Sequence, residues 1–132
     1  MKRSMILLFT LIAMPLLGNW DVERRKIDYL LKQIKEVEGT FIRNGTAHTP
    51  EEAVAHLEMK LKRAMNSWFA PAKEEWTAVM FIEKLASKSS FSGTPYQIRF
   101  SDGRTVNAGE WLFDKLHQIP FQTQSQPLED PY

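Results

Sequence analysis

The sequence predicts an α+β domain that is predominantly helical, with about four helices and a small β-hairpin between the third and fourth helices. Several segments carry apolar residues at three- and four-residue spacing, which is typical of amphipathic helices. One segment, residues 96–100, alternates apolar and polar side chains, as a half-buried strand does. The chain has 132 residues, of which 43% are hydrophobic and 25% charged, and these values suit one globular domain.

Residues 1–18 are predicted to be a signal peptide. Lys2 and Arg3 precede a nearly continuous apolar run that ends at Leu17, and Gly18 follows as a small residue at the expected cleavage point. This run is short for a helix that crosses the core of a bilayer. The alternative is an uncleaved segment that anchors the chain to a membrane, and no other membrane contact is expected.

The rest of the chain is expected to form a single globular domain, residues 19–120, located in the periplasm or secreted. Residues 121–132 are polar and rich in proline, so they are predicted to be a flexible C-terminal tail. The net charge of +1 is too small for a nucleic-acid-binding surface. There is no cysteine, which excludes disulfides and cysteine chemistry, and no motif indicates a cofactor.

The first helix is predicted at residues 21–38, with Gly39 as its C-cap. Residues 41–43 are then a short extended piece. Asn44 and Gly45 form a turn signal, because both residue types tolerate positive φ.

The second helix begins with a predicted capping box, in which Thr49 is the N-cap, Pro50 takes the first helical position and Glu52 closes the box. The third helix is predicted at about residues 72–86 and is followed by a serine-rich loop. Tryptophans on the apolar faces of the helices are expected in the core, and these are Trp68, Trp76 and Trp111.

The predicted hairpin turns at Asp102 and Gly103, and residues 105–106 pair back on the strand. A second predicted capping box, from Asn107 to Glu110, begins the fourth helix.

A set of short motifs runs from the first predicted turn to the predicted strand. The motifs are Phe41-Ile42-Arg43-Asn44-Gly45, His48-Thr49, Glu52-Ala53, His56-Leu57, Lys60-Leu61, Phe81-Ile82, Ala86-Ser87, Ser89-Ser90, Ser92-Gly93 and Pro95-Tyr96. In combination they resemble the YfeK-like family (DUF5329), which comprises small exported proteins of Gram-negative bacteria with unknown function. The resemblance covers about residues 27–116 and implies export and a shared fold, but it implies no activity.

The same segments contain polar side chains that suit an anionic ligand. These candidate binding residues are Arg43, Asn44, His56, Lys60, Ser87, Ser89, Ser90 and Ser92. His56 and Lys60 lie four residues apart, so they emerge one above the other on one flank of the second helix. Fixed cations, small hydroxyls and loop N–H groups bind carboxylates and phosphates well. The structural alternative is that Arg43 and His56 brace the loop while the serines satisfy backbone groups.

His48, Glu52 and His56 recur every four residues and belong to residue types that bind zinc. His48, however, precedes the N-cap, and three groups spread over two helical turns diverge from one point. The pattern therefore favours a structural role, and no metal is expected.

The sequence favours a non-enzymatic binding module of the cell envelope, which recognises an anionic small molecule, an envelope fragment or a partner protein. The alternative is a small envelope hydrolase with His56 as general base, which needs a serine hydroxyl or a carboxylate within hydrogen-bond reach of that imidazole. No nucleophile-elbow pattern is present, so no catalytic residue is assigned. A third hypothesis is an interaction protein whose partner covers an exposed apolar patch.

Overall fold

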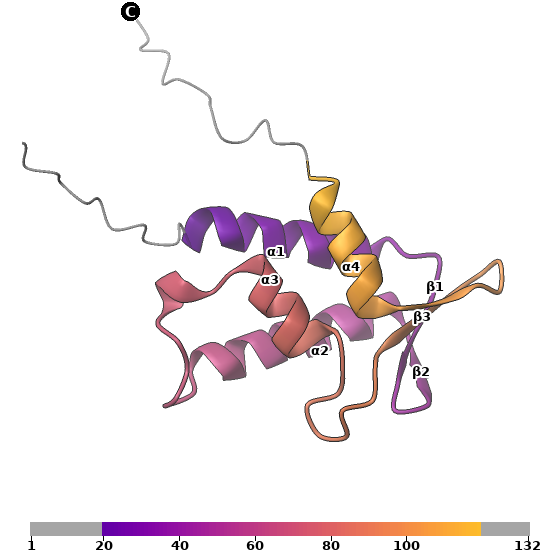
Figure 1. The fold of residues 1–132 in the computed structure, drawn as a ribbon. Helices are drawn as coiled ribbons and strands as arrows, with labels where there is room; N and C mark the ends of the chain where they lie inside the picture. Colours follow the sequence, from indigo (N-terminus) through magenta and orange to yellow (C-terminus); the bar gives the residue numbers. More distant parts are fainter. Residues whose placement is uncertain (1–19, 120–132) are drawn as a thin grey trace, which may run out of the picture.

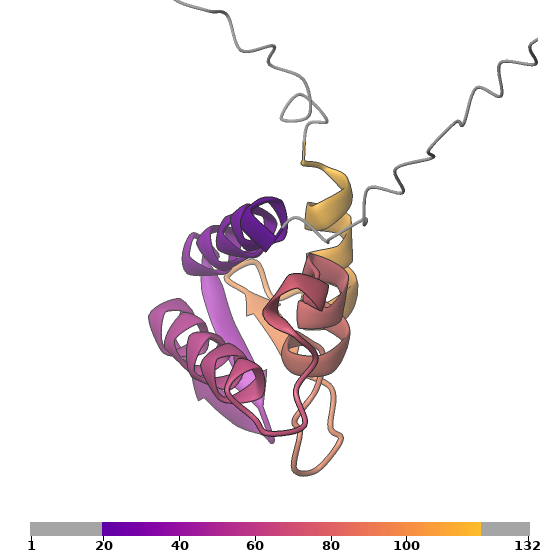
Figure 2. The same cartoon turned by 90° about the vertical axis from the view of Figure 1, so that its left-hand side faces the viewer.

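Two β-hairpins from separate parts of the chain join in one sheet, and the helices gather on one side of it (Figures 1 and 2). The computed structural model describes residues 20–119. In chain order the elements are α1 (Trp20–Lys35), β1 (Gly39–Arg43), β2 (Thr46–His48), α2 (Pro50–Met65), the 3-10 turn η1 (Lys73–Glu75), α3 (Ala78–Phe81), the π-helix η2 (Ile82–Ala86), β3 (Gln97–Phe100), β4 (Thr105–Asn107) and α4 (Ala108–His117). Within these residues, no helix combines the length and the apolar character that a membrane span requires.

The predicted signal peptide and the predicted C-terminal tail lie outside the described residues. Both therefore stay predictions, as does the location of the protein.

The sheet is antiparallel throughout, in the order β2-β1-β3-β4. Phe41 lies directly opposite both His48 and Ile98, so these three side chains share one face. That face is covered by helices, and Phe41 and Ile98 are buried in the core. The other face carries Gln97 and Arg99, which are exposed. One face of the sheet is thus free of helices within residues 20–119.

The α+β class, the four helices and the hairpin between the third and fourth helices (β3 and β4) are confirmed, but that hairpin is not the only one, because β1 and β2 form another between α1 and α2. The extended piece at residues 41–43 is the end of β1, which pairs with β2 on one side and with β3 on the other. The predicted turn joins β1 to β2, with φ of 49° at Asn44 and 78° at Gly45. β2 has only three residues, which is too short to display an alternating pattern.

Gly39 is not the C-cap of the first helix. α1 ends at Lys35, and Gly39 is the first residue of β1. A Cβ atom at Gly39 would overlap the carbonyl oxygen of Arg99 in β3. The glycine is therefore required by the close approach of two strands, and not by a helix end.

The third predicted helix begins later than expected, at Ala78 instead of residue 72. Thr77 is its N-cap, and the Thr77 hydroxyl accepts a hydrogen bond of 3.1 Å from the N–H of Met80. The carboxylate of Glu23 in α1 accepts a second bond of 2.8 Å from the N–H of Ala78. These two bonds satisfy N–H groups that a helix start leaves free, so they fix where α3 begins.

One of the two predicted capping boxes is confirmed. The Thr49 hydroxyl and the Glu52 carboxylate exchange hydrogen bonds with each other's backbone N–H groups at the start of α2. Asn107, in contrast, is the last residue of β4 and makes no side-chain cap, so the second predicted box was wrong. The N–H of Ala108 instead donates to the carbonyl of Tyr96 at 2.8 Å, because α4 follows directly on the sheet.

The core lies between the helices and the covered face of the sheet. Its largest fully buried side chains are Phe81, Ile27, Leu30, Ile34, Leu61, Ile82, Ile98 and Leu112. Each such side chain contributes about 1.5–3 kcal/mol by leaving water. Trp76 is buried and Trp111 packs against the core. Trp68 is 92% exposed, and its predicted place in the core was wrong because α2 ends before it, at Met65.

Replacement of Gly39 by alanine is expected to lower the free energy of unfolding by about 2 kcal/mol or more, because the new methyl group overlaps the backbone of β3. Gly45→Ala is the control, since its Cβ meets no atom and suffers only the strain of a positive φ, about 1–2 kcal/mol. Urea unfolding of both variants checks this. Equal destabilisation would contradict the role given to Gly39.

Candidate functional site

Lys60 links α2 to the end of the helix formed by α3 and η2. Its ammonium donates to the carbonyl of Leu85 at 2.7 Å, to the carbonyl of Lys88 at 3.3 Å and to the hydroxyl of Tyr96 at 3.1 Å. An ammonium has three protons, so its hydrogen-bonding capacity is used completely. The carbonyls at a helix C-terminus lack partners within the helix and carry a partial negative charge, which a cation stabilises.

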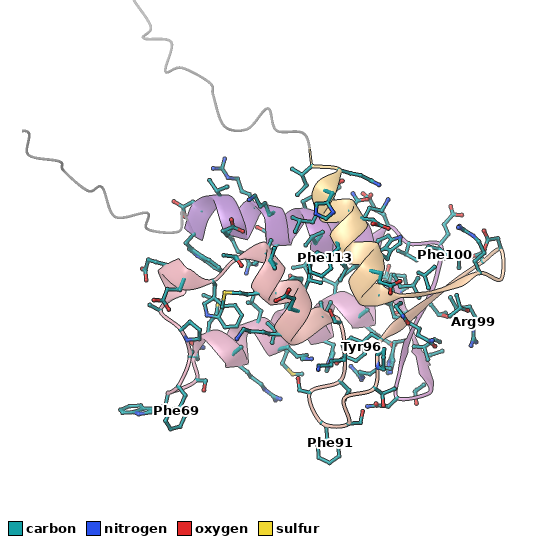
Figure 3. All side chains as sticks on the ribbon, in the orientation of Figure 1. Phe69, Phe91, Tyr96, Arg99, Phe100 and Phe113 are labelled. Carbon is teal, nitrogen blue, oxygen red and sulfur yellow. The ribbon has the colours of Figure 1, made fainter. Side chains whose placement is uncertain are left out.

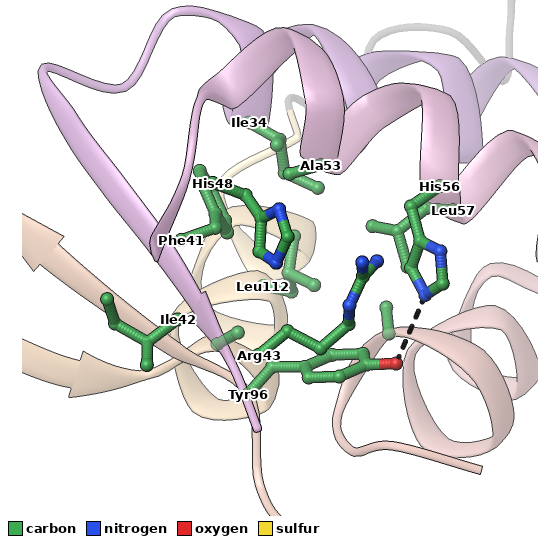
Figure 4. Close-up of a pocket in the computed structure, with 12 residues that line it drawn as sticks. Ile34, Phe41, Ile42, Arg43, His48, Ala53, His56, Leu57, Tyr96 and Leu112 are labelled. Carbon is green, nitrogen blue, oxygen red and sulfur yellow. Dashed lines mark hydrogen bonds between the residues drawn. The ribbon is translucent and has the colours of Figure 1, made fainter. Parts of the chain in front are cut away.

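Tyr96 passes this interaction on to His56. Its hydroxyl oxygen lies 3.4 Å from Nε2 of His56 (Figure 4). The oxygen accepts a hydrogen bond from Lys60, and the hydroxyl can donate its own proton to Nε2. In this arrangement the imidazole is neutral and carries its proton on Nδ1.

The charges around His56 favour the same neutral form. The pKa of His56 is lowered from 6.5 to about 4, mainly by burial and then by the positive charges of Arg43, Lys60, His48 and Arg63, in that order. Burial also lowers the pKa of Lys60, with a smaller contribution from Arg43. The pKa of Tyr96 is raised by burial, against the opposing effect of Arg43. The imidazole is therefore uncharged at neutral pH.

Arg43 completes this cluster from the sheet. It is the last residue of β1 and lies on the covered face, two residues beyond Phe41. Its side chain extends over the Tyr96 ring and toward the region between His48 and His56 (Figure 4). Among residues 20–119, no carboxylate forms a salt bridge with Arg43 or Lys60. We call the four residues Arg43, His56, Lys60 and Tyr96 the cationic cluster.

A small cavity of about 30 Å³ lies beneath the cluster. Its wall is largely apolar and includes Phe41, Leu57 and Leu112, while Arg43 and His56 stand at its polar edge (Figure 4). This volume holds a water molecule or two, whereas pockets that enclose a small ligand measure roughly 300–1,000 Å³. The site can therefore contact an anionic group at its surface but does not enclose a whole molecule.

A second polar network lies next to the cationic cluster and starts at Asn44. The Asn44 amide donates to the Ser89 hydroxyl at 3.4 Å and accepts from the Ser92 hydroxyl at 2.7 Å. The Ser92 and Thr94 hydroxyls lie 3.0 Å apart, and the N–H of Ser92 donates to Ser89. This network joins the β1–β2 turn to the serine-rich loop.

Two of the candidate serines do not join either group. The Ser87 hydroxyl donates to the carbonyl of Ile82 at 2.6 Å and packs against Gly109, where a Cβ would lie only 2.7 Å from that hydroxyl. Ser87 therefore caps η2 and packs against the start of α4. Ser90 is exposed at the loop surface. The structure thus brings together Arg43, His56 and Lys60, and separately Asn44, Ser89 and Ser92.

The three residues considered for zinc do not converge. Nδ1 of His48 lies 3.2 Å from the Glu52 carboxylate, while His56 faces Tyr96. Across residues 20–119, no group of three or more histidine, cysteine, aspartate or glutamate side chains could hold a metal ion.

Tyr96 is the site residue that sequence reasoning missed. It was read only as an apolar position of the strand, and its ring is indeed buried. Its hydroxyl reaches Lys60 and His56, which are 36 and 40 residues away in the chain. The preference of a buried tyrosine hydroxyl for a polar partner was the available signal, but it does not identify the partner.

Replacement of Lys60 by methionine is expected to lower the free energy of unfolding by about 1–3 kcal/mol, because the carbonyls of Leu85 and Lys88 lose their donor. Lys62→Met is the matched control, since Lys62 is exposed on the same helix, and it should change stability by no more than about 0.5 kcal/mol. Urea unfolding compares the two. Similar effects of both substitutions would contradict the assignment.

The lowered pKa of His56 predicts that stability depends on pH. Between pH 6.5 and about pH 4 the unfolded chain binds a proton at His56 that the folded chain does not bind. This contribution to stability is therefore complete above pH 6.5 and is lost as the pH falls toward 4. Between pH 7 and pH 4.5, the free energy of unfolding should fall less in His56→Gln than in the parent. The control is His117→Gln, at the exposed end of α4, in which it should fall as much as in the parent. An equal fall in His56→Gln and the parent would contradict the prediction.

Comparison with known proteins identifies the family of this chain but assigns no activity to it. The chain is 39% identical over 88 residues to the uncharacterized protein YfeK of Salmonella typhimurium, a match that covers 65% of this chain and 68% of that protein. No solved structure matches the chain. The model of the family of unknown function DUF5329 matches residues 21–120. Because that match takes in most of the sequence, the chain belongs to the DUF5329 family.

Proposed function

We propose that the protein is an exported, non-enzymatic binding module that recognises an anionic group through the cationic cluster. The group would be a carboxylate or phosphate on a small molecule, an envelope fragment or a partner protein. The observation that carries the proposal is the gathering of Arg43 and Lys60 around His56 and Tyr96 without a carboxylate in a salt bridge to either cation among the described residues. Cations that lack an internal counter-charge attract an external one.

Within the cluster, Arg43 is the residue best suited to touch the ligand. The three protons of Lys60 are already donated to protein acceptors, so Lys60 adds positive charge but no free hydrogen bond. A guanidinium binds carboxylate and phosphate through two parallel hydrogen bonds. With its Nε2 facing Tyr96, His56 keeps an Nδ1 proton that it can donate.

The small size of the cavity favours an anionic group presented at the surface over an enclosed ligand. A terminal carboxylate of a peptide or a phosphate of an envelope polymer fits this requirement, since only the charged group has to reach Arg43. The apolar wall beneath excludes water on one side, which strengthens the interaction between charges.

The hydrolase alternative gains less support. A general base needs a serine hydroxyl or carboxylate within reach, and the hydrogen-bond partner of His56 within residues 20–119 is Tyr96. A pKa of about 4 also makes the imidazole a weak base. A binding role does not need His56 to accept a proton.

The proposal predicts that an anion stabilises the fold through Arg43. The chain of residues 19–132 would be heated with inorganic phosphate, sugar acids, muropeptides or zinc. A ligand at a hundredfold its dissociation constant stabilises the folded state by about 2.7 kcal/mol. For a domain of this size the melting temperature then rises by roughly ten degrees.

Two variants make the test specific. Arg43→Ala should abolish the rise, whereas Arg99→Ala, which removes an exposed arginine from the opposite face of the sheet, should keep it. A rise with zinc alone, an equal rise in both variants, or no rise with any anion would count against the proposal.

A further inference from the structure

Three aromatic side chains project into solvent from two loops. Trp68 and Phe69, which follow α2, are each 92% exposed, and Phe91 in the serine-rich loop is fully exposed at 101%. Phe69 and Phe91 point away from the body of the protein on the same side, the lower one in Figure 3. Both loops lie on the lower side of the molecule in Figures 1 and 2, although Figure 1 shows the loop after α2 at the left and the serine-rich loop further to the right.

Exposed basic residues lie close in sequence to these aromatic residues. The stretch of residues 59–73, which holds Trp68 and Phe69, contains four basic residues and no acidic residue. Before Phe91 in the sequence, Lys84 and Lys88 are both exposed.

Two of these cations lie near the contact between α2 and the serine-rich loop. Arg63 comes one helical turn after Lys60, and the Lys60 ammonium bonds the backbone of Lys88 at 3.3 Å. Both Arg63 and Lys88 are exposed. This side of the protein therefore combines protruding aromatic residues with positive charge.

We propose that this side docks on an anionic lipid surface, with Trp68, Phe69 and Phe91 inserted at the boundary between headgroups and acyl chains. Aromatic rings partition to that boundary, and each nearby lysine or arginine strengthens binding to an anionic leaflet about fivefold. The inference does not depend on the anion site proposed above.

The form of this surface favours a bilayer over a protein partner. The aromatic residues stand on separate loop tips, flanked by small polar residues such as Ser67, Ser90 and Ser92. None of the three aromatic residues lines the cavity beneath the cationic cluster. None of them lines the larger, open hollow beside α4 either, whose wall includes Val37, Phe100 and Trp111. A protein partner is usually held by a contiguous, well-packed patch, whereas separate tips can each enter a fluid interface.

The test uses residues 19–132, so that the apolar N-terminal run does not itself bind lipid. Every residue of the buried core lies between Ile27 and Leu112, so this chain retains all packed elements, and a thermal melt verifies its folding. Co-sedimentation would be measured with vesicles of phosphatidylcholine alone and of phosphatidylcholine mixed with phosphatidylglycerol. We expect binding to the mixed vesicles, weaker binding at high salt, and a blue shift of tryptophan emission that is absent in Trp68→Phe.

The triple variant Trp68→Ser, Phe69→Ser, Phe91→Ser should bind mixed vesicles at least about tenfold more weakly. Val79→Ser, at a position that is 42% exposed on α3, is the control and should bind as the parent does.

Charge reversal tests the electrostatic part. Arg63→Glu with Lys88→Glu should weaken binding at least about tenfold. Lys32→Glu with Lys35→Glu makes the same change in net charge on α1, on the opposite side of the molecule, and should weaken binding less (Figure 1).

The proposal is overturned if the parent does not bind the mixed vesicles, or if the triple variant binds them equally well. Cross-linking to a protein through Trp68 or Phe91, combined with absent vesicle binding, would likewise overturn it and assign the surface to a protein partner.

Discussion

The ammonium of Lys60 is the contact on which the arrangement of the candidate site depends. It joins α2 to the C-terminal end of η2 and to the hydroxyl of Tyr96, which directly precedes β3. Three segments far apart in sequence are therefore held together by hydrogen bonds to one ammonium group. A helix end buried without donors would lose about 1–3 kcal/mol for each unsatisfied carbonyl. A lysine suits this position because its three protons diverge toward three acceptors that no planar group could reach together.

The electrostatics of the site follow from this placement. The three protons of Lys60 are directed to protein acceptors, so the neighbour of Nε2 of His56 is the Tyr96 hydroxyl. Arg43 adds a second positive charge near the imidazole. Partial burial lowers the effective dielectric constant around these groups, so each charge acts more strongly on its neighbours. The result is a neutral imidazole among cations, an arrangement that suits recognition of an anion better than abstraction of a proton.

The sequence predicted some local features correctly, although the C-cap at Gly39 and the capping box at Asn107 were wrong, and it did not predict the long-range ones. The capping box at Thr49 and the turn at Asn44 and Gly45 depend on neighbouring residues, and both are confirmed. The pairing of β1 with β3 connects residues that are more than fifty positions apart, and no local pattern encodes it. Likewise Arg43, His56 and Lys60 were identified by residue type, but Tyr96 was missed because its hydroxyl is assigned a role only by the fold. Trp68 was misplaced because its helix ends three residues before it.

A double-mutant cycle between Lys60 and Tyr96 tests the central claim most directly. Unfolding free energies would be measured for the parent, Lys60→Met, Tyr96→Phe and the double variant. If the ammonium and the hydroxyl form one unit, the two substitutions are coupled by at least about 1 kcal/mol. Additive effects, within about 0.5 kcal/mol, would contradict the account, because Lys60 and Tyr96 would then stabilise the fold independently.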